Sequence, residues 1–163
     1  MLTNTPHLPT VQQLVAAKKG MPGALLPVLH DIQDSVGYIP AEAVADIAQQ
    51  LNLSRSEVHG VITFYHHFRQ QPAGRNVLQV CRAEACQSMG GEGLWDHACQ
   101  QLQGVGHCDS DTSADGAVTL QPVYCLGLCS SSPAVSWNGQ VHARMDAAKL
   151  DSLLATANGG GTA

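Results

Sequence analysis

Residues 81–86 read Cys81-Arg82-Ala83-Glu84-Ala85-Cys86 (C-x4-C), and residues 125–129 read Cys125-Leu126-Gly127-Leu128-Cys129 (C-x3-C). Each motif follows an apolar, β-favouring run, at 77–80 and at 118–124, and small residues come after each. We therefore expect both motifs on loops at strand ends, where their thiols can converge on one point. Four converging soft thiolates are typical ligands of an iron–sulfur cluster or of zinc.

The spacing of these cysteines leaves three interpretations open. Structural zinc sites use short C-x2–4-C hairpins that wrap one small ion, whereas C-x4-C with C-x3-C forms wider loops that suit a larger diamond of two irons and two sulfides. A thioredoxin-like dithiol normally has C-x-x-C, which this chain lacks. Disulfides are rare in a reducing cytosol. The spacing favours a [2Fe–2S] cluster, with zinc next and a redox dithiol or disulfide last.

Composition and charge argue against a nucleic-acid-binding, membrane-spanning or secreted protein. The chain has 163 residues and a formal net charge of −5, which gives no electrostatic reason to expect nucleic acid or an anionic membrane as a partner. It has no apolar run of about 18 residues, the length a membrane-spanning helix needs. Residues 1–6 lack the basic start and apolar centre of a signal peptide. We expect a cytoplasmic protein with no membrane contact of its own.

Residues 1–72 are predicted to form a helical bundle, because apolar residues recur there at helical spacing. Ser54-Arg55-Ser56-Glu57 is a capping box, and Gly37 is a typical helix stop. Four helices are predicted: 10–20 with Thr10 as its cap, 22–35, a third with Pro40 in its first turn, and a fourth running from the capping box to Phe68.

The pattern changes after Gln71-Pro72-Ala73-Gly74, which is predicted to be a domain boundary. Residues 73–158 alternate strands and helices, which predicts an α/β domain with a thioredoxin-like layer of helices on a mixed sheet. Asn138-Gly139 indicates a type I′ hairpin, and Asp146 is a predicted helix cap. Residues 159–163 are predicted to be a flexible tail. The predicted strands are 76–81, 117–124, 134–137 and 140–143, the first helix is 92–103, and 104–116 is predicted to be irregular.

Further stretches match a known family. They are Leu29–Gln33, Gly37–Pro40, Gly60–Tyr65 and Pro133–Val135, in addition to the two cysteine motifs. Over about residues 20–155 the chain resembles the thioredoxin-like [2Fe–2S] ferredoxin family, represented by the 24 kDa (E) subunit of NADH dehydrogenase complex I. The resemblance implies one [2Fe–2S] cluster held by Cys81, Cys86, Cys125 and Cys129. Departures are Ser130, where the family often has Gly, and Arg82 and Glu84, where complex I commonly has small residues.

Within the family, His59–His66 and Cys81–Gln87 look most like the gamma subunit of soluble, NAD-dependent, molybdenum-containing formate dehydrogenases. That resemblance implies an electron-transfer subunit without an active site of its own, exchanging single electrons with a flavin. FMN, NAD, further Fe–S clusters and the molybdenum cofactor are expected on partners, namely a flavin- and NAD-binding subunit and a molybdenum-containing catalytic subunit. Consistent with this expectation, the chain has no Gly-rich dinucleotide fingerprint and no phosphate loop.

Two alternatives lie within the same class: the E subunit of NADH:quinone oxidoreductase and the diaphorase subunit of a bidirectional hydrogenase. A structural zinc-binding assembly module is the alternative from another class.

Other residues receive smaller roles. Backbone N–H groups around Gly90, Gly91 and Gly127 are expected to donate to the cluster sulfurs. Arg82 and Glu84 are expected to form surface salt pairs. Cys99 is expected in the core, because it lies on the apolar face of its helix, and Cys108 is expected to be a spare thiol.

Overall fold

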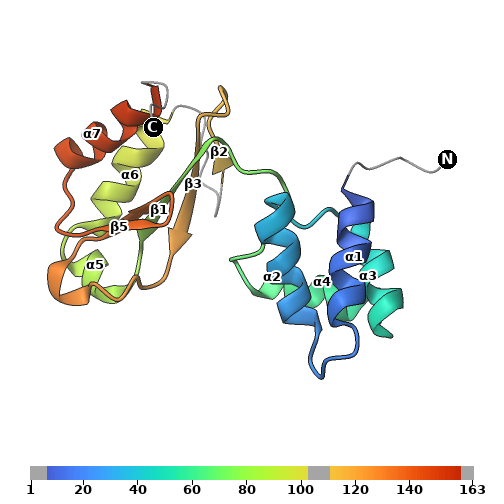
Figure 1. The fold of residues 1–163 in the computed structure, drawn as a ribbon. Coiled ribbons are helices and arrows are strands. Elements are labelled where there is room, and N and C mark those ends of the chain that lie inside the picture. The colour runs from blue at the N-terminus through green and yellow to red at the C-terminus, as the bar shows by residue number, and fades with distance from the viewer. Residues whose placement is uncertain (1–6, 103–110, 159–163) are drawn as a thin grey trace. The chain divides into compact units, whose positions relative to one another are not determined.

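The computed structural model describes residues 7–102 and 111–158. The chain divides into two compact units, Met1–Pro72 and Ala73–Ala163, and each is described by itself (Figure 1). The first unit is helical and the second contains a sheet, so the predicted fold class is confirmed.

The helices of the first unit are short and joined by brief turns. Within the described residues they are α1 (Leu8–Lys18), α2 (Leu25–Val36), α3 (Ala43–Leu51) and α4 (Arg55–Phe64). The prediction that Thr10 caps the first helix is wrong. That helix begins two residues earlier, with Pro9 in its first turn, where a missing N–H costs no helical hydrogen bond. The predicted starts of the second and third helices, near Pro22 and Pro40, are also too early.

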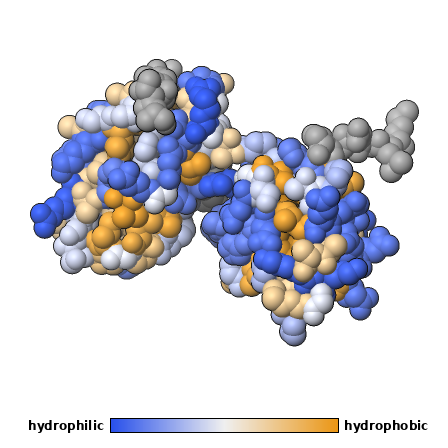
Figure 2. Space-filling model, in the orientation of Figure 1, coloured by the Kyte–Doolittle hydropathy of each residue, from blue (hydrophilic) through white to orange (hydrophobic). Residues whose placement is uncertain are grey.

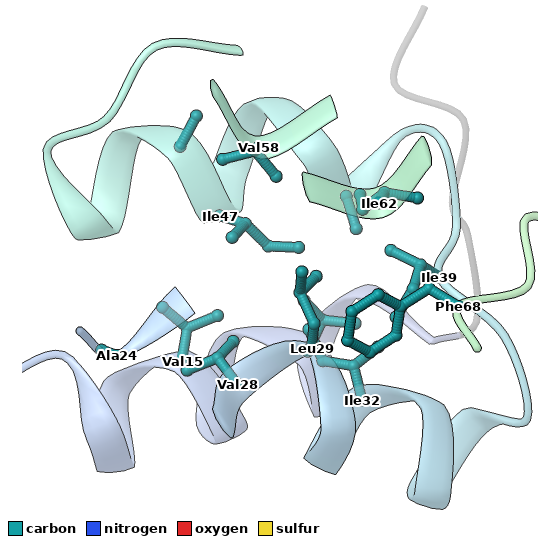
Figure 3. Packing of buried hydrophobic residues seen from close by; sticks show 13 residues of the cluster. Val15, Ala24, Val28, Leu29, Ile32, Ile39, Ile47, Val58, Ile62 and Phe68 are labelled. Carbon is teal, nitrogen blue, oxygen red and sulfur yellow. The ribbon is translucent and has the colours of Figure 1, made fainter. Parts of the chain in front are cut away.

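Local start and stop signals of this unit are confirmed. Glu57 N donates to Ser54 Oγ at 3.1 Å, and Ser54 N donates to Glu57 Oε2 at 2.7 Å, which completes the capping box. Gly37 ends α2 with a φ of 91°, a left-handed conformation that glycine adopts without strain. Figure 3 shows the core, with Leu29 and Ile32 on one side and Ile47 and Val58 on the other.

Phe68 is buried in this core, yet it does not lie on α4 as predicted, because the helix ends at Phe64. The reason is a buried glutamine. Gln33 Nε2 donates to His67 O at 2.6 Å and Gln33 Oε1 accepts from Arg69 N at 2.6 Å. These two bonds satisfy backbone groups that a longer helix would have paired internally, and they hold Phe68 against α2.

The second unit is a mixed sheet with strand order β2-β3-β1-β4-β5 in the described residues. β1 and β3 are parallel, and the other neighbours are antiparallel. Asn138 and Gly139 form the predicted hairpin turn with φ angles of 51° and 85°. The elements are β1 (Asn76–Cys81), α5 (Glu84–Ser88), α6 (Gly91–Gln101), β2 (Asp111–Thr112), β3 (Val118–Val123), the 3₁₀ turn η1 (Cys129–Ser131), β4 (Val135–Trp137), β5 (Gln140–His142) and α7 (Ala147–Asn158).

Helices α6 and α7 pack together, and their apolar faces share a core with the sheet residues Leu78, Val80 and Leu120 (Figure 1). Asp146 caps α7 as predicted, accepting from Lys149 N at 2.9 Å. Three elements were not predicted: the five-residue α5, β2 in a stretch expected to be irregular, and the 3₁₀ turn η1.

Apolar side chains also reach the surface of each unit (Figure 2). Phe64 is 73% exposed in the first unit, and Met89 and Tyr124 are 63% and 61% exposed in the second. No helix in the described parts of the chain has both the length and the apolar character that a membrane crossing requires.

Candidate metal centre

Both cysteine motifs lie at the carboxyl ends of two neighbouring strands, on the same side of the sheet. β1 and β3 run parallel, and Cys81, the last residue of β1, is paired with Val123, the last residue of β3. The carboxyl ends of parallel strands lie side by side, so the loops that follow them start next to each other. Arg82 N continues the pairing by donating to Val123 O at 2.8 Å. The two motifs therefore lie at adjacent strand ends, as expected, but the first is not on a loop, because Cys81 is still part of β1 and Cys86 lies on α5.

The first pair of cysteines is buried and built into regular structure. Cys81 is 3% exposed and Cys86 is 2% exposed. Cys86 lies on α5, whose first turn is closed by a hydrogen bond from Cys86 N to Ala83 O at 2.9 Å. The two side chains pack in one buried cluster, and each thiol shifts the pKa of the other. The C-x4-C loop therefore presents its two sulfur atoms as one contacting pair.

The second pair is exposed and lies in less regular backbone. Cys125 Sγ and Cys129 Sγ are 3.7 Å apart. Two thiolates on one tetrahedral metal, each about 2.3 Å from it, are separated by about 3.8 Å. Cys125 has a φ of 104°, a left-handed value that strains any residue with a side chain. The geometry of this pair fits two ligands of a single metal ion.

The two pairs contact each other through the backbone and one hydroxyl group. The backbone N–H groups of Cys125 and Leu126 lower the pKa of the Cys81 thiol. Cys86 Sγ lies 3.8 Å from Ser132 Oγ, and that hydroxyl donates to Cys129 O at 2.8 Å. Within the described residues, no three or more His, Cys, Asp or Glu side chains are arranged around a single metal position. The four thiols therefore form two pairs, and the two pairs lie at one site.

The thiols of the first pair have opposite pKa shifts. Burial raises the pKa of Cys81, but hydrogen bonds from the N–H of Ala83, from Cys86 and from the other loop outweigh it, so the pKa lies below its usual value. Burial and the neighbouring Cys81 raise the pKa of Cys86. In the second pair, the contact with Cys125 raises the pKa of Cys129. Cys81 therefore ionises more readily than an ordinary cysteine thiol, and ionisation is what a metal ligand requires.

The glycine predictions have mixed outcomes. Gly127 N donates to Cys125 Sγ at 3.4 Å, so a sulfur-directed N–H at Gly127 is confirmed. The same prediction for Gly90 is wrong, because Gly90 N donates to Gln87 O at 3.0 Å and closes the turn after α5. Gly91 has a packing role: a Cβ at this position would lie 2.6 Å from Cys86 O. The start of α6 is thus in direct backbone contact with the first cysteine loop.

The remaining predicted residues are placed as follows. Arg82 forms the expected salt pair, and its partner is Glu92 at 2.9 Å. Glu84 is exposed at the start of α5. Cys99 packs against the core of the second unit as expected, and burial raises its pKa. Cys108 lies outside the described residues.

Several residues of the site carry no recognisable sequence signal. Ala83 and Ala134 contribute backbone N–H groups to Cys81 and Cys86, a role independent of side-chain type. Ser132 lies in the run of small residues after the second motif, and nothing in that run distinguishes it from Ser130 and Ser131. Glu92 is ten residues from Arg82 in the sequence, and their contact depends on how α6 packs against the loop.

Comparison with known proteins agrees with this geometry. The family model described as thioredoxin-like [2Fe-2S] ferredoxin matches residues 11–158. NADH-quinone oxidoreductase subunit 2 of Thermus thermophilus is 33% identical over 84% of this chain and 75% of its own length. The E 2 subunit of the Rhizobium meliloti NADH-quinone oxidoreductase is 37% identical over 80% of this chain and 76% of its own length.

A solved structure shows a similar fold in a longer chain. The air-oxidized NAD+-reducing [NiFe]-hydrogenase matches 83% of this chain with a TM-score of 0.66 and 26% identity. The match covers only 23% of that hydrogenase chain, so the fold is one part of it. By sequence, fold and the arrangement of its cysteines, the present chain belongs to the thioredoxin-like [2Fe–2S] ferredoxin family.

Proposed function

We propose that this chain is the electron-transfer subunit of a cytoplasmic NAD-dependent formate dehydrogenase complex. It holds one [2Fe–2S] cluster through Cys81, Cys86, Cys125 and Cys129 and exchanges single electrons with a flavin on a partner subunit. The observation that carries the proposal is the convergence of two thiol pairs at one edge of the sheet, in a member of a [2Fe–2S] family.

The donor set fits the cluster. A [2Fe–2S] cluster takes four cysteine thiolates, and each of its two irons needs two of them. The contact between Cys81 and Cys86 and the 3.7 Å separation of Cys125 and Cys129 provide such pairs. In this assignment, the buried pair would hold one iron and the exposed pair would hold the other.

When bound, the cluster supplies one-electron redox chemistry. The protein has to stabilise the negative charge that gathers on the sulfur atoms. The Gly127 N–H donates to Cys125 Sγ, and the N–H groups of Ala83, Cys125 and Leu126 lower the pKa of Cys81, so these groups would provide that stabilisation. The exposed Cys125 and Cys129 leave one edge of the site open to a partner. No general acid, base or nucleophile is required.

The partners follow from the same proposal. The flavin- and NAD-binding subunit would exchange electrons with this chain, and the molybdenum-containing subunit would oxidise formate. Formate oxidation and NAD reduction each move two electrons, so a flavin must join and split them. FMN, NAD, further Fe–S clusters and the molybdenum cofactor are therefore assigned to partners.

A second candidate is a subunit of NADH:quinone oxidoreductase or of a bidirectional hydrogenase. Its support is direct: the relatives from Thermus and Rhizobium are NADH-quinone oxidoreductase subunits, and the matched structure is an NAD+-reducing hydrogenase. The formate dehydrogenase assignment is carried by the His59–His66 and Cys81–Gln87 motifs.

Purification of the native complex separates these candidates. Formate-dependent NAD reduction by the complex supports the proposal. NADH-dependent quinone reduction or hydrogen-dependent NAD reduction, without formate activity, contradicts it in favour of the second candidate.

Serine substitutions test the ligand assignment. Serine at any of the four ligand positions should lower iron and sulfide content, whereas Cys99→Ser and Cys108→Ser should not. A full cluster in Cys125→Ser would overturn the assignment. Stoichiometric zinc without iron or sulfide would instead favour the zinc assembly module.

A further inference from the structure

Glu92, in the first turn of α6, contacts the residue that follows each cysteine of the first pair. Arg82, which follows Cys81, donates from Nη2 to Glu92 Oε2 at 2.9 Å and from Nε to Oε1 at 3.3 Å. Gln87, which follows Cys86, donates from Nε2 to Glu92 Oε1 at 3.3 Å. A single carboxylate therefore joins both ends of the cysteine loop to one helix.

Arg82 is held from further directions. Its guanidinium carbon lies 4.9 Å from the ring centroid of Trp95, one turn along α6, and Trp95 itself is 7% exposed. Its backbone N–H donates to Val123 O, at the end of β3. Because a forked guanidinium–carboxylate pair is directional, this set of contacts gives Arg82 a defined position beside Cys81.

The first turn of α6 is in close contact with the same loop. Gly91 leaves no room for a Cβ between α6 and the carbonyl group of Cys86. The Arg82–Glu92 pair is partly exposed, with side-chain exposures of 28% and 45%. Such a pair contributes little to folding stability. Its contacts join the residues that follow Cys81 and Cys86, which points to a role in the geometry and charge of the site.

We propose that Glu92 is a positioning residue for the metal centre. Its carboxylate holds Arg82 and Gln87, and thereby the first cysteine pair, against α6, and it neutralises the guanidinium of Arg82, the residue that follows Cys81. The inference rests on the proposed assignment of the four cysteines as cluster ligands. Glu92 is not one of the four ligands, yet it should affect the reduction potential of the cluster. Reduction adds negative charge to the cluster, and an unpaired charge nearby changes the free energy of that step.

Charge-changing variants of similar shape test this proposal in the cluster-loaded full chain. Glu92→Gln leaves Arg82 without its counter-charge, so the reduction potential should shift to a more positive value. Arg82→Gln leaves Glu92 unpaired, so the potential should shift to a more negative value. The double variant should lie closer to the wild type than either single variant. EPR-monitored redox titration measures all three, and the EPR line shape of the reduced cluster reports the geometry.

Asp31→Asn provides a matched control. It removes the carboxylate of the Lys18–Asp31 pair, which has a similar exposure of 34% and 32% but lies in the helical unit. This variant should leave the potential and the EPR spectrum unchanged. Glu92→Asp, which keeps the charge, should shift the potential less than Glu92→Gln and serves as the second variant if Glu92→Gln does not fold.

Shifts of the same sign in Glu92→Gln and Arg82→Gln, or no change in potential and line shape in either, would overturn the role of Glu92. A wild-type chain without a [2Fe–2S] signal, or a full cluster in Cys81→Ser, would instead contradict the proposed ligand assignment. The two failures are therefore distinguishable.

Discussion

The two cysteine pairs are supported in different ways. Cys81 and Cys86 are buried, lie on a strand and a helix, and pack against the start of α6 through Gly91. Cys125 and Cys129 are exposed, and the loop between them holds Cys125 at a φ of 104°. The first pair is positioned by the fold, whereas the second pair depends on its loop backbone and on whatever the thiols bind.

This difference suggests a division of roles. In the proposed assignment, the buried pair, with several backbone N–H groups near it, would stabilise charge and retain the metal, and the exposed pair would bring the opposite side of the site to the surface. Strained backbone is often found at functional sites, and here it lies on the exposed side. The predictions below test whether the fold itself positions the first pair more firmly than the second.

Replacing Gly91 should have the largest effect. In Gly91→Ala the new methyl group would lie 2.6 Å from Cys86 O, so the loop or the helix must shift. We expect a loss of about 1–3 kcal/mol in the free energy of unfolding of the second unit, with loss of bound iron. Both tryptophans lie in that unit, so urea unfolding followed by tryptophan fluorescence reports on it alone.

Gly93→Ala is the matched control, because no heavy atom lies within 4 Å of a Cβ placed at Gly93 on the same helix. Alanine should stabilise the helix there by about 1 kcal/mol or less. Equal effects at positions 91 and 93 would show that α6 does not constrain the first pair.

Removing the cluster should loosen the two loops unequally. Hydrogen exchange of cluster-bound and cluster-free protein should show amides of residues 125–131 exchanging about tenfold faster, or more, once the cluster is lost. Amides of α5 and α6 should change much less, because buried packing holds them. Equal loosening of both loops would contradict the comparison.

The strain at Cys125 predicts an unusual order of stability in the cluster-free protein. Cys125→Gly should be more stable than Cys125→Ala by about 1 kcal/mol, because glycine tolerates the positive φ. At Cys129, which is not among the positive-φ residues, alanine should be the more stable of the two. Urea unfolding measures both orders, and the same order at both positions would argue against strain at Cys125.

Ser132→Ala should have the smallest effect. It removes the hydroxyl that donates to Cys129 O and contacts Cys86 Sγ, at an expected cost of about 1 kcal/mol or less. Ser152→Ala also removes a hydroxyl-to-carbonyl bond, on the exposed face of α7, and should be neutral or slightly stabilising. Identical results for the two variants would show that Ser132 does not link the loops.

Local signals in the sequence predicted much of the fold. The Ser54–Glu57 capping box, the Asn138-Gly139 turn and the Asp146 cap each depend on a few neighbouring residues, and each is confirmed. The boundaries that failed depend on distant contacts. The end of α4, for example, depends on Gln33, which pairs with the backbone of 67–69 from another helix.

The site was predictable in outline only. Two apolar runs, each followed by cysteines, indicated that the two motifs lie at adjacent strand ends, and the parallel register of β1 and β3 confirms this. α5 is too short to show helical periodicity. Gly91 and Glu92 contact the first cysteine loop only because the fold packs α6 against it. No sequence pattern predicts these contacts.

Metal and sulfide analysis of the purified chain, with EPR after reduction, tests the central claim most directly. The account predicts about two irons and two acid-labile sulfides per chain and the EPR signal of a reduced [2Fe–2S] cluster. It also predicts that both pairs are needed, so Cys81→Ser and Cys129→Ser should each lower that content. One equivalent of zinc with no sulfide, or an unchanged iron content in both variants, would contradict it.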